Sequence, residues 1–209
     1  MPELPEVETT RRGVEPYSRG RTVRQLVVRE PRLRWPVPPD LPRLMQGQVI
    51  EAVERRAKYL LFQTANGTLM VHLGMSGSLR VVEPREQPGK HDHIDILMRD
   101  GASLRFNDPR RFGSFLWLEP GEQHPLLSHL GPEPLSGAFD GDLLYRRSRG
   151  RKGPVKQFIM DGKVVVGVGN IYANEALFLS GIRPDRAAGR ISAARYQRLS
   201  NNIKQVLTS

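Results

Sequence analysis

The sequence predicts an α+β protein of more than one domain, in which a β-sandwich with a short N-terminal helix precedes a helical domain. Up to residue 135, short apolar runs alternate with turn signals such as Asn66-Gly67 and Asp100-Gly101, a spacing typical of sandwiches and barrels. From Gly141 onward the apolar residues recur at helical spacing instead. We therefore expect domains at residues 1–135 and 136–209, with the Pro- and Gly-rich segment Gly131–Gly141 as the linker.

The expected elements follow from periodicity and from flanking turn or capping residues. The predicted strands are Val23–Val28, Ala52–Thr64, Leu69–Val82, His91–Arg99, Ser103–Asn107 and Ser114–Leu118. The predicted helices are Glu6–Gly13, Asp142–Arg149, Val155–Met160, Ile171–Ser180 and a last one through Leu199 and Ile203. Pro5 suits the start of the first helix, Gly13 its end, and Ser192 the N-cap of the last.

Positive charge indicates the class of partner. The 32 Lys and Arg residues exceed the 22 acidic residues, which gives a net charge of +10. Such an excess favours a polyanion, because each phosphate that a protein neutralises releases counterions. A basic protein without such a partner remains the alternative on net charge alone. The cations also cluster, with Asp161 the single acid among Arg146, Arg147, Arg149, Arg151, Lys152, Lys156 and Lys163.

Several classes of function lack their usual signals. The sequence contains no cysteine, so disulfides and thiolate metal sites are excluded within these residues. No apolar stretch approaches the roughly 18 residues of a membrane-spanning helix. The acidic start MPELPEVETT has no apolar signal-peptide core. We therefore expect a monomeric cytoplasmic protein with no membrane partner.

The N-terminus can supply a nucleophile. Removal of Met1 would leave Pro2 with a free secondary amine, and its attack on a sugar C1′ gives an iminium that accepts electrons in a later elimination. A neighbouring carboxylate, Glu3 or Glu6, could move protons. Without further context, a frayed terminus with helix-capping charge is the better interpretation of these residues.

Two further patterns invite a binding interpretation. His91 and His93 alternate in a predicted strand, but two histidines make a poor metal site, so a hydrogen-bonding or phosphate-contacting His91 is the better interpretation. Gly167-Val168-Gly169-Asn170 precedes a predicted helix, where backbone N–H groups could bind a phosphate. A lone glycine turn is weak evidence by itself.

Eight sequence blocks, taken in order, give these patterns a common interpretation. In order, they are MPELPEVETTRRGVEP, RLRWPV, ERRAKYLLF, HLGMSGSLR, KHDHIDI, NDPRRFG, HLGPEPL and VVVGVGNIYANEALF. Together they resemble the formamidopyrimidine-DNA glycosylase family almost end to end, and MPELPEV favours this branch over its pyrimidine-preferring relatives. The resemblance implies a helix–two-turn–helix element in the helical domain. It also implies a bifunctional glycosylase and abasic-site lyase that removes 8-oxoguanine and formamidopyrimidines from duplex DNA.

The resemblance assigns roles residue by residue. It implies Pro2 as the Schiff-base nucleophile, Glu3 as the proton donor at the sugar, and Lys58 as a lysine that assists elimination. From the pattern alone, Lys58 would be a solvated strand residue. Extruding a base leaves a hole in the stack, which an apolar wedge and a guanidinium can fill. The void-filling residues implied are Met75, Arg110 and Phe112, and the implied DNA contacts are His91, Arg110, Arg151, Lys156 and Asn170.

The sequence departs from the family in one respect. Family members continue into a zinc finger with four cysteines and a DNA-gripping arginine, whereas these 209 residues contain no cysteine. We therefore expect no zinc or other cofactor in these residues. The partner that the resemblance implies is damaged double-stranded DNA. The alternative function is a damaged-DNA-binding protein with weak or no turnover. A general basic RNA-binding protein does not explain the N-terminus or the void-filling loop.

Overall fold

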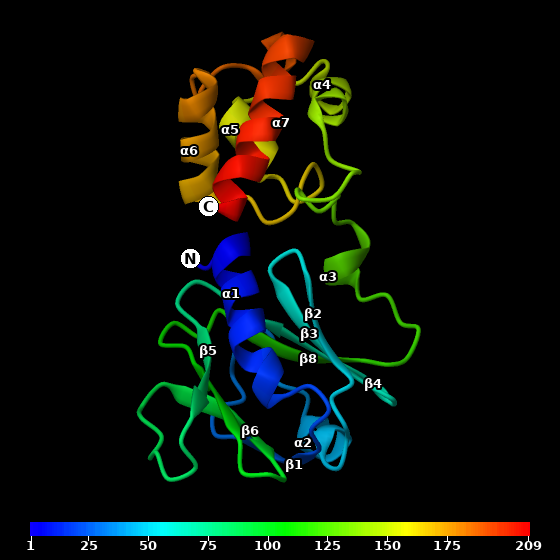
Figure 1. Cartoon of the computed structure of the whole chain (residues 1–209), viewed down its shortest axis with the longest axis vertical. Helices are drawn as coiled ribbons and strands as arrows, with labels where there is room; N and C mark the ends of the chain where they lie inside the picture. Colours follow the sequence, from blue (N-terminus) through cyan, green and yellow to red (C-terminus); the bar gives the residue numbers. More distant parts are fainter. The chain divides into compact units, whose positions relative to one another are not determined.

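The computed structural model describes all 209 residues, which form two compact units. The first unit contains Met1, Pro2 and residues 6–124, and the second contains residues 3–5 and 125–209. The chain passes through the eight strands of the first unit and then through the helices of the second. Its path can be followed by colour in Figure 1. The predicted boundary between residues 135 and 136 stays a prediction.

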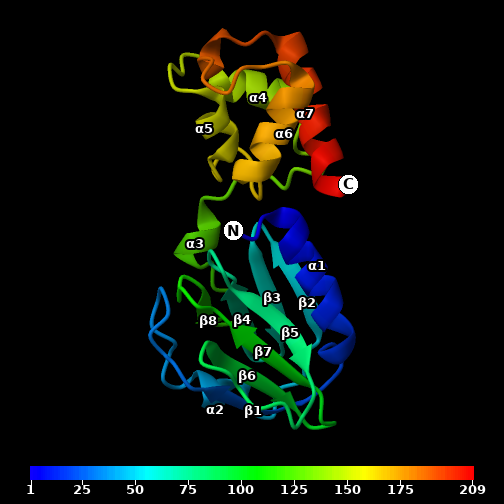
Figure 2. The ribbon, with the colours of Figure 1, turned by 90° about the vertical axis from the view of Figure 1, so that its left-hand side faces the viewer.

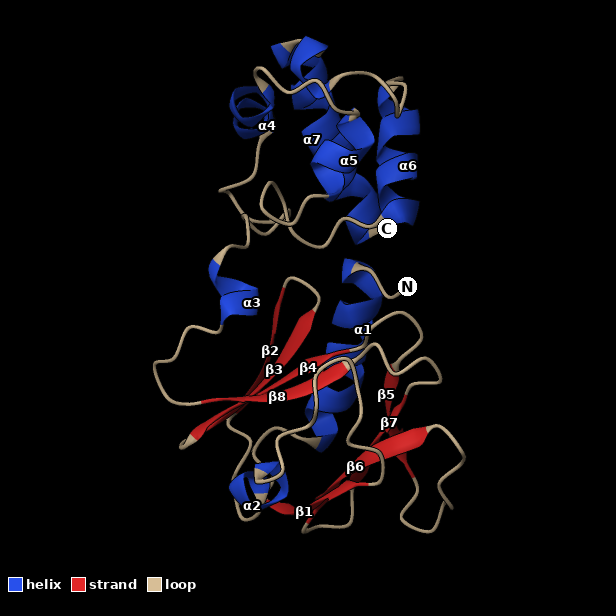
Figure 3. Ribbon diagram, turned by 180° about the vertical axis from the view of Figure 1, so that it is seen from behind, coloured by secondary structure: helices blue, strands red, loops and turns tan.

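The first unit is built from two antiparallel sheets of four strands each (Figure 3). One sheet has the order β1 (Val23–Val28), β6 (Asp92–Met98), β7 (Ser103–Asn107) and β5 (Ser78–Val82). The other has the order β2 (Ala52–Arg56), β3 (Tyr59–Thr64), β4 (Gly67–His72) and β8 (Ser114–Leu118). The sheets share one core, in which the rings of Phe106 and Phe115 lie 5.0 Å apart. The predicted sandwich is confirmed.

The N-terminal helix is longer than predicted. Helix α1 spans Leu4–Val14 and continues into the 3₁₀ turn η1, Glu15–Tyr17. Gly13 does not end it, because the buried residue Val14 still packs into the core of the first unit. A short helix α2, Leu41–Met45, completes this unit and packs against β1.

Two of the predicted strands are wrong as single runs. Ala52–Thr64 divides into β2 and β3 at Ala57, whose φ of 53° places it in the left-handed region. Leu69–Val82 divides into β4 and β5 at the loop of residues 73–77, in which Gly74 has a φ of 67°. Alanine is not a turn residue by composition, so the first break has no local signal.

The second unit is helical, as predicted (Figure 2). Its elements are α3 (Pro125–Ser128), α4 (Gly141–Ser148), α5 (Val155–Met160), α6 (Asn170–Ser180), η2 (Ala188–Arg190) and α7 (Ala193–Thr208). The longest helix, α7, packs against α4 and α6. Its predicted N-cap is confirmed, because the Ser192 side chain accepts the Arg195 N–H at 3.4 Å.

The segment predicted as a linker is packed into this helical unit. The Gly131 N–H donates to the Gly162 carbonyl at 2.7 Å, and the Val166 N–H donates to the Pro132 carbonyl at 3.2 Å. Phe139 is fully buried in the core of the unit. Its Pro and Gly content therefore reflects an irregular but ordered path rather than a free connection.

Candidate functional site

The carboxylate of Glu3 is buried at the start of α6. Its side chain is only 2% exposed. It accepts backbone N–H groups from Gly169 at 3.0 Å, Ile171 at 2.9 Å and Tyr172 at 3.3 Å. The first turn of a helix leaves such N–H groups without intrahelical partners, and its dipole favours a negative charge. These bonds fix the orientation of the one carboxylate that directly follows Pro2.

Two glycines allow Glu3 and its neighbour to come this close. A Cβ atom added to Gly169 would lie 2.4 Å from Cδ of Glu3, and one added to Gly167 would lie 2.5 Å from Leu4. The Leu4 N–H also donates to the Gly167 carbonyl at 3.2 Å. The glycine turn interpreted from sequence as a phosphate cradle thus uses the Gly169 N–H to hold a side chain of the same protein. Asn170 is exposed, and its contact with DNA stays a prediction.

Pro2 directly precedes this carboxylate along the chain. While Met1 is attached, the Pro2 nitrogen is an amide and has no nucleophilic lone pair. Removal of Met1, whose side chain is 49% exposed, converts it to an amine. The amine would then lie next to Glu3, because a peptide bond joins Pro2 to Glu3 and places their Cα atoms about 3.8 Å apart.

Lys58 lies in a tight turn, which corrects its interpretation as a strand residue. Arg56 and Tyr59 pair across β2 and β3, so the turn contains only Ala57 and Lys58. A positive φ at the first of two hairpin-turn residues normally requires glycine, and alanine there stores strain. The Arg55 guanidinium supports the turn by donating to the Ala57 carbonyl at 2.8 Å.

Glu8 on α1 fixes the other side of Arg55. Its carboxylate accepts from Arg55 at 3.2 Å and from Arg11 and Arg12 at 3.0 Å. Although burial raises the pKa of Glu8, hydrogen bonds from Arg11 and Arg12 and the charge of Arg55 lower it below the ordinary value. Helix α1 therefore connects through Glu8 and Arg55 to the turn that presents Lys58.

His72, at the end of β4, belongs to the same region. Its ring lies 4.8 Å from that of Tyr59, its cross-strand partner, and its Nδ1 accepts the Gly74 N–H at 2.9 Å. Burial, with the charges of Lys58 and Arg34, lowers the pKa of His72 to about 4. The imidazole is thus neutral at pH 7, as an acceptor at Nδ1 requires.

Acid should weaken the first unit through His72. The pKa of His72 is 6.5 when unperturbed and about 4 in the fold. Between pH 6.5 and pH 4, His72 is therefore protonated in the unfolded chain and neutral in the folded one. The free energy of unfolding therefore falls by about 3 kcal/mol as pH drops from 6.5 to 4. Denaturant titrations of the wild type and of His72→Gln at several pH values test this. Equal pH dependence in both proteins would contradict the assignment.

The predicted void-filling residues come together on two adjoining loops, residues 73–77 and 108–113. A Cβ atom on Gly74 would lie 2.5 Å from the Gly113 nitrogen, so the two backbones pack directly against each other. Met75 is 40% exposed and Phe112 is 41% exposed. The Arg110 guanidinium lies 4.8 Å from the centre of the Phe112 ring. An apolar wedge and a cation are thus presented side by side.

Asp108 holds these two loops together and was not identified from sequence. Its carboxylate is fully buried and accepts the Ser76 hydroxyl at 2.9 Å and the Gly113 N–H at 2.8 Å. The Ser76 oxygen in turn accepts the Arg110 N–H at 3.2 Å. The sequence Asn-Asp-Pro signals a turn, but nothing in it shows that the aspartate points inward.

His91 and His93 differ in environment. His93 is buried, with Nε2 2.8 Å from the Asp108 carbonyl oxygen, whereas His91 precedes β6 and is half-buried. A register shift between Asp92 and Ile94 breaks the regular alternation expected for this strand. The predicted phosphate contact of His91 stays a prediction.

No zinc site can be assembled from these residues. The sequence has no cysteine, and no group of three or more His, Asp or Glu side chains is placed to hold a metal ion. None of the helices has the length and apolar character needed to cross a membrane.

The predicted DNA contacts of the second unit lie on or beside α5 and α6, which pack together (Figure 2). Asn170 is the first residue of α6, and Lys156 lies on α5. Arg151 is exposed; its guanidinium lies 5.2 Å from the Phe158 ring and 3.9 Å from Asp161. Their roles toward DNA stay predictions.

Comparison with known proteins assigns both units. The family model of the formamidopyrimidine-DNA glycosylase N-terminal domain matches residues 1–115, and that of the H2TH domain matches residues 130–209. The formamidopyrimidine-DNA glycosylase of Hahella chejuensis is 62% identical over 209 residues, which are 100% of this chain and 77% of that protein. The enzyme of Stenotrophomonas maltophilia is 61% identical over 208 residues, or 99% of this chain and 77% of the relative.

Solved structures agree. The glycosylase of Lactococcus lactis, bound to DNA with an abasic site, is 29% identical with a TM-score of 0.92, and the match covers 99% of this chain and 80% of that one. The MutM (Fpg) protein of Thermus thermophilus is 39% identical with a TM-score of 0.87, covering 99% and 75%. The fold and the matched models define a DNA glycosylase. The chain belongs to the formamidopyrimidine-DNA glycosylase family, which confirms the resemblance noted in the sequence.

Proposed function

We propose that the protein is a bifunctional DNA glycosylase and abasic-site lyase of base excision repair that acts on oxidised purines. The observation that carries the proposal is the buried Glu3 carboxylate, oriented by three N–H groups directly after a potential N-terminal amine. A nucleophile and a positioned proton donor are the two groups this chemistry needs. Family membership supplies the reaction class.

The reaction then proceeds at one deoxyribose. The Pro2 amine attacks C1′, and Glu3 takes up the proton that this amine loses and passes it to the sugar ring oxygen. The ring opens, and the damaged base departs with a proton from water, which leaves an iminium between Pro2 and C1′. The resulting iminium accepts the electrons released when a C2′ proton is lost, so β-elimination breaks the 3′ C–O bond. δ-Elimination then breaks the 5′ bond, and Lys58 assists these steps as a cation near the phosphates.

The substrate is damaged duplex DNA in the bacterial cytoplasm. Extrusion of the damaged nucleotide leaves a void that Met75 and Phe112 fill, while Arg110 faces the orphaned base. The backbone is held by His91, Arg110, Arg151, Lys156 and Asn170. The relative from Lactococcus lactis, crystallised with DNA containing an abasic site, supports this choice of partner.

A damaged-DNA-binding protein without turnover is the second candidate. The observation in its favour is that Met75 and Phe112 are exposed beside the Arg110 guanidinium, an arrangement that can bind DNA without a nucleophile. The void-filling loops need no free amine to bind DNA. The mass of the N-terminal peptide separates the two candidates, because only the enzyme requires loss of Met1.

Borohydride trapping tests the proposal. We expect a covalent adduct between the protein and an 8-oxoguanine:cytosine duplex, with Met1 absent from the adduct. Pro2→Gly keeps a primary amine, so it should trap more slowly without losing all lyase activity. A gel shift with an abasic analogue runs alongside. A shift without an adduct supports the binding protein. If the protein gives no shift and no adduct, that result contradicts both candidates.

A further inference from the structure

A cationic hollow borders the loop of residues 108–113 in the first unit. It has a volume of about 580 Å³ and combines two exposed aromatic rings with four guanidinium groups. Its lining includes Arg32, Arg34, Trp35, Arg110, Arg111 and Phe112. The RLRW segment, residues 32–35, thus faces the same space as two of the predicted void-filling residues.

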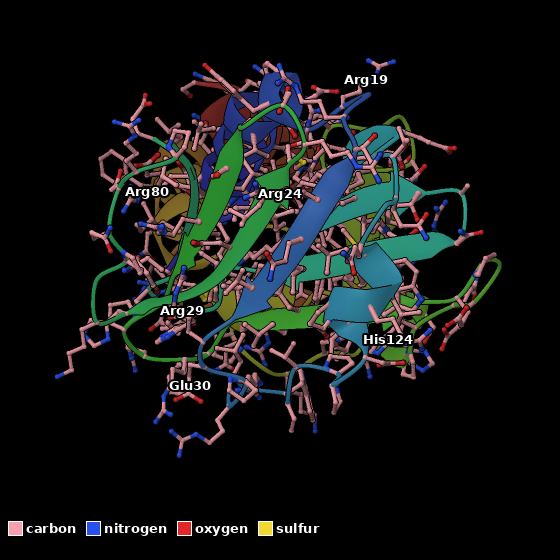
Figure 4. The ribbon with its side chains drawn as sticks, turned by 90° about the horizontal axis from the view of Figure 1, so that it is seen from below. Arg19, Arg24, Arg29, Glu30, Arg80 and His124 are labelled. Atoms are coloured by element: carbon pink, nitrogen blue, oxygen red, sulfur yellow. The ribbon has the colours of Figure 1, made fainter.

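The positive charge of the hollow is only partly neutralised. Glu30, which follows β1 (Figure 4), pairs with Arg32 at 2.7 Å and with Arg111 at 3.6 Å. Hydrogen bonds from Arg32 and the charge of Arg111 lower the pKa of Glu30 to about 2, so it stays ionised. Arg34 and Arg110 enter no ion pair. Two guanidinium groups are therefore available to an anion at neutral pH.

The aromatic rings are presented to solvent beside those guanidinium groups. Trp35 is 44% exposed, and the Arg34 guanidinium lies 5.9 Å from its ring centre. The same pairing recurs between Arg110 and Phe112, at 4.8 Å. A solvated cationic surface would need no exposed indole, because exposing a large aromatic surface to water is unfavourable.

Backbone hydrogen bonds hold the Trp35 segment against the loop of residues 108–113. Val37 is buried, and its N–H donates to the Pro31 carbonyl at 2.9 Å, which closes a tight loop around the tryptophan. The Arg34 N–H donates to the Gly113 carbonyl at 3.2 Å. Trp35 is thus fixed in place rather than left on a free segment, and ordering it costs little when a ligand binds.

We propose that this hollow binds a nucleotide next to the void, with its base stacked on Trp35 and its phosphate at Arg34. The inference rests on the proposed function. A nucleotide combines a planar π surface with an anion, which matches an exposed indole beside an unpaired guanidinium. The DNA-binding surface then includes this hollow as well as the residues that replace the extruded base.

Binding to a duplex containing an abasic analogue tests this with two variants and a matched control. Trp35→Ala should weaken binding about 10-fold or more, the effect of losing one stacked base. Arg34→Gln should weaken binding and reduce the slope of log K against log salt concentration by about 1. Arg24→Gln removes the same charge from an exposed, unpaired arginine on β1 (Figure 4) and should change neither quantity.

The same titration identifies the strand. A weakening by Trp35→Ala that is equal for the duplex and for the damaged strand alone places the nucleotide in the damaged strand. A weakening confined to the duplex places it in the complementary strand. If the wild type binds the damaged duplex and both variants match it, this inference is overturned while the proposed function stands. If the wild type shows no preference for damaged DNA, both fail.

Fluorescence supplies a readout that a purely structural role would not change. The protein has two tryptophans, so Trp117→Phe leaves Trp35 as the only indole. Stacking of a base should quench Trp35 fluorescence in this variant, with the same midpoint as the gel shift. Binding without any change in this fluorescence would overturn the stacking contact.

Discussion

Replacing Glu3 by glutamine is expected to lower the rate of base release from an 8-oxoguanine duplex by about 100-fold or more, the usual contribution of a general acid. Glutamine has the shape of glutamate but no transferable proton. Single-turnover measurement of base release tests this with binding at saturation. A wild-type rate in the variant would remove Glu3 from the reaction.

The contacts of Glu3 add a second effect that sequence alone does not suggest. Both carboxylate oxygens accept N–H groups, from Gly169, Ile171 and Tyr172. A glutamine must turn its own NH₂ group toward at least one of these donors. Leaving a buried N–H without an acceptor costs about 1–3 kcal/mol, so Glu3→Gln should also lower the free energy of unfolding.

A matched variant separates chemistry from position. Gly169→Ala keeps the carboxylate, but the added Cβ would lie 2.4 Å from Cδ of Glu3 and must displace it. We expect this variant to lose base release as well, without any change in the acid itself. If Gly169→Ala releases base at the wild-type rate, the position of the carboxylate fixed by α6 is not what the reaction requires.

Strand positions were predictable where turn residues lie on both sides. Val23–Val28, Ser103–Asn107 and Ser114–Leu118 were predicted with the bounds that the structure has, since short apolar runs between turn residues leave little freedom. The break after Arg56 was not predictable, because Ala57 adopts a positive φ only under constraint from its surroundings. Arg55 and Glu8 supply part of that constraint from another element.

The site shows the same limit at longer range. The resemblance indicated Glu3, but only the fold shows that residues 166 to 169 positions away bind its carboxylate. The glycine turn predicted exposed N–H groups for a phosphate, and the fold shows that the Gly169 N–H bonds the Glu3 carboxylate instead. Asp108 and His72 carried no signal beyond their residue types, because their importance lies in burial and in partners on neighbouring loops.

Substituting Asp108 by alanine is expected to impair recognition of damage although Asp108 itself is buried. The substitution leaves the Gly113 N–H without its acceptor and frees the Ser76 hydroxyl, at a cost of about 1–3 kcal/mol of unfolding free energy for the buried N–H alone. The loops carrying Met75 and Phe112 would then lose the carboxylate that joins them. Asp108→Asn keeps one oxygen for the Gly113 N–H and should recover much of the stability.

The decisive measurement is the ratio of affinities for damaged and undamaged duplex, made well below the unfolding temperature. A role limited to stability would leave this ratio unchanged in the folded Asp108→Ala protein, whereas a positioning role lowers it, because filling the void matters only where a base has been extruded. Asp40→Ala, at an exposed site in the same unit, should alter neither stability nor the ratio. A buried carboxylate that never contacts DNA would then determine how well the protein distinguishes a damaged site.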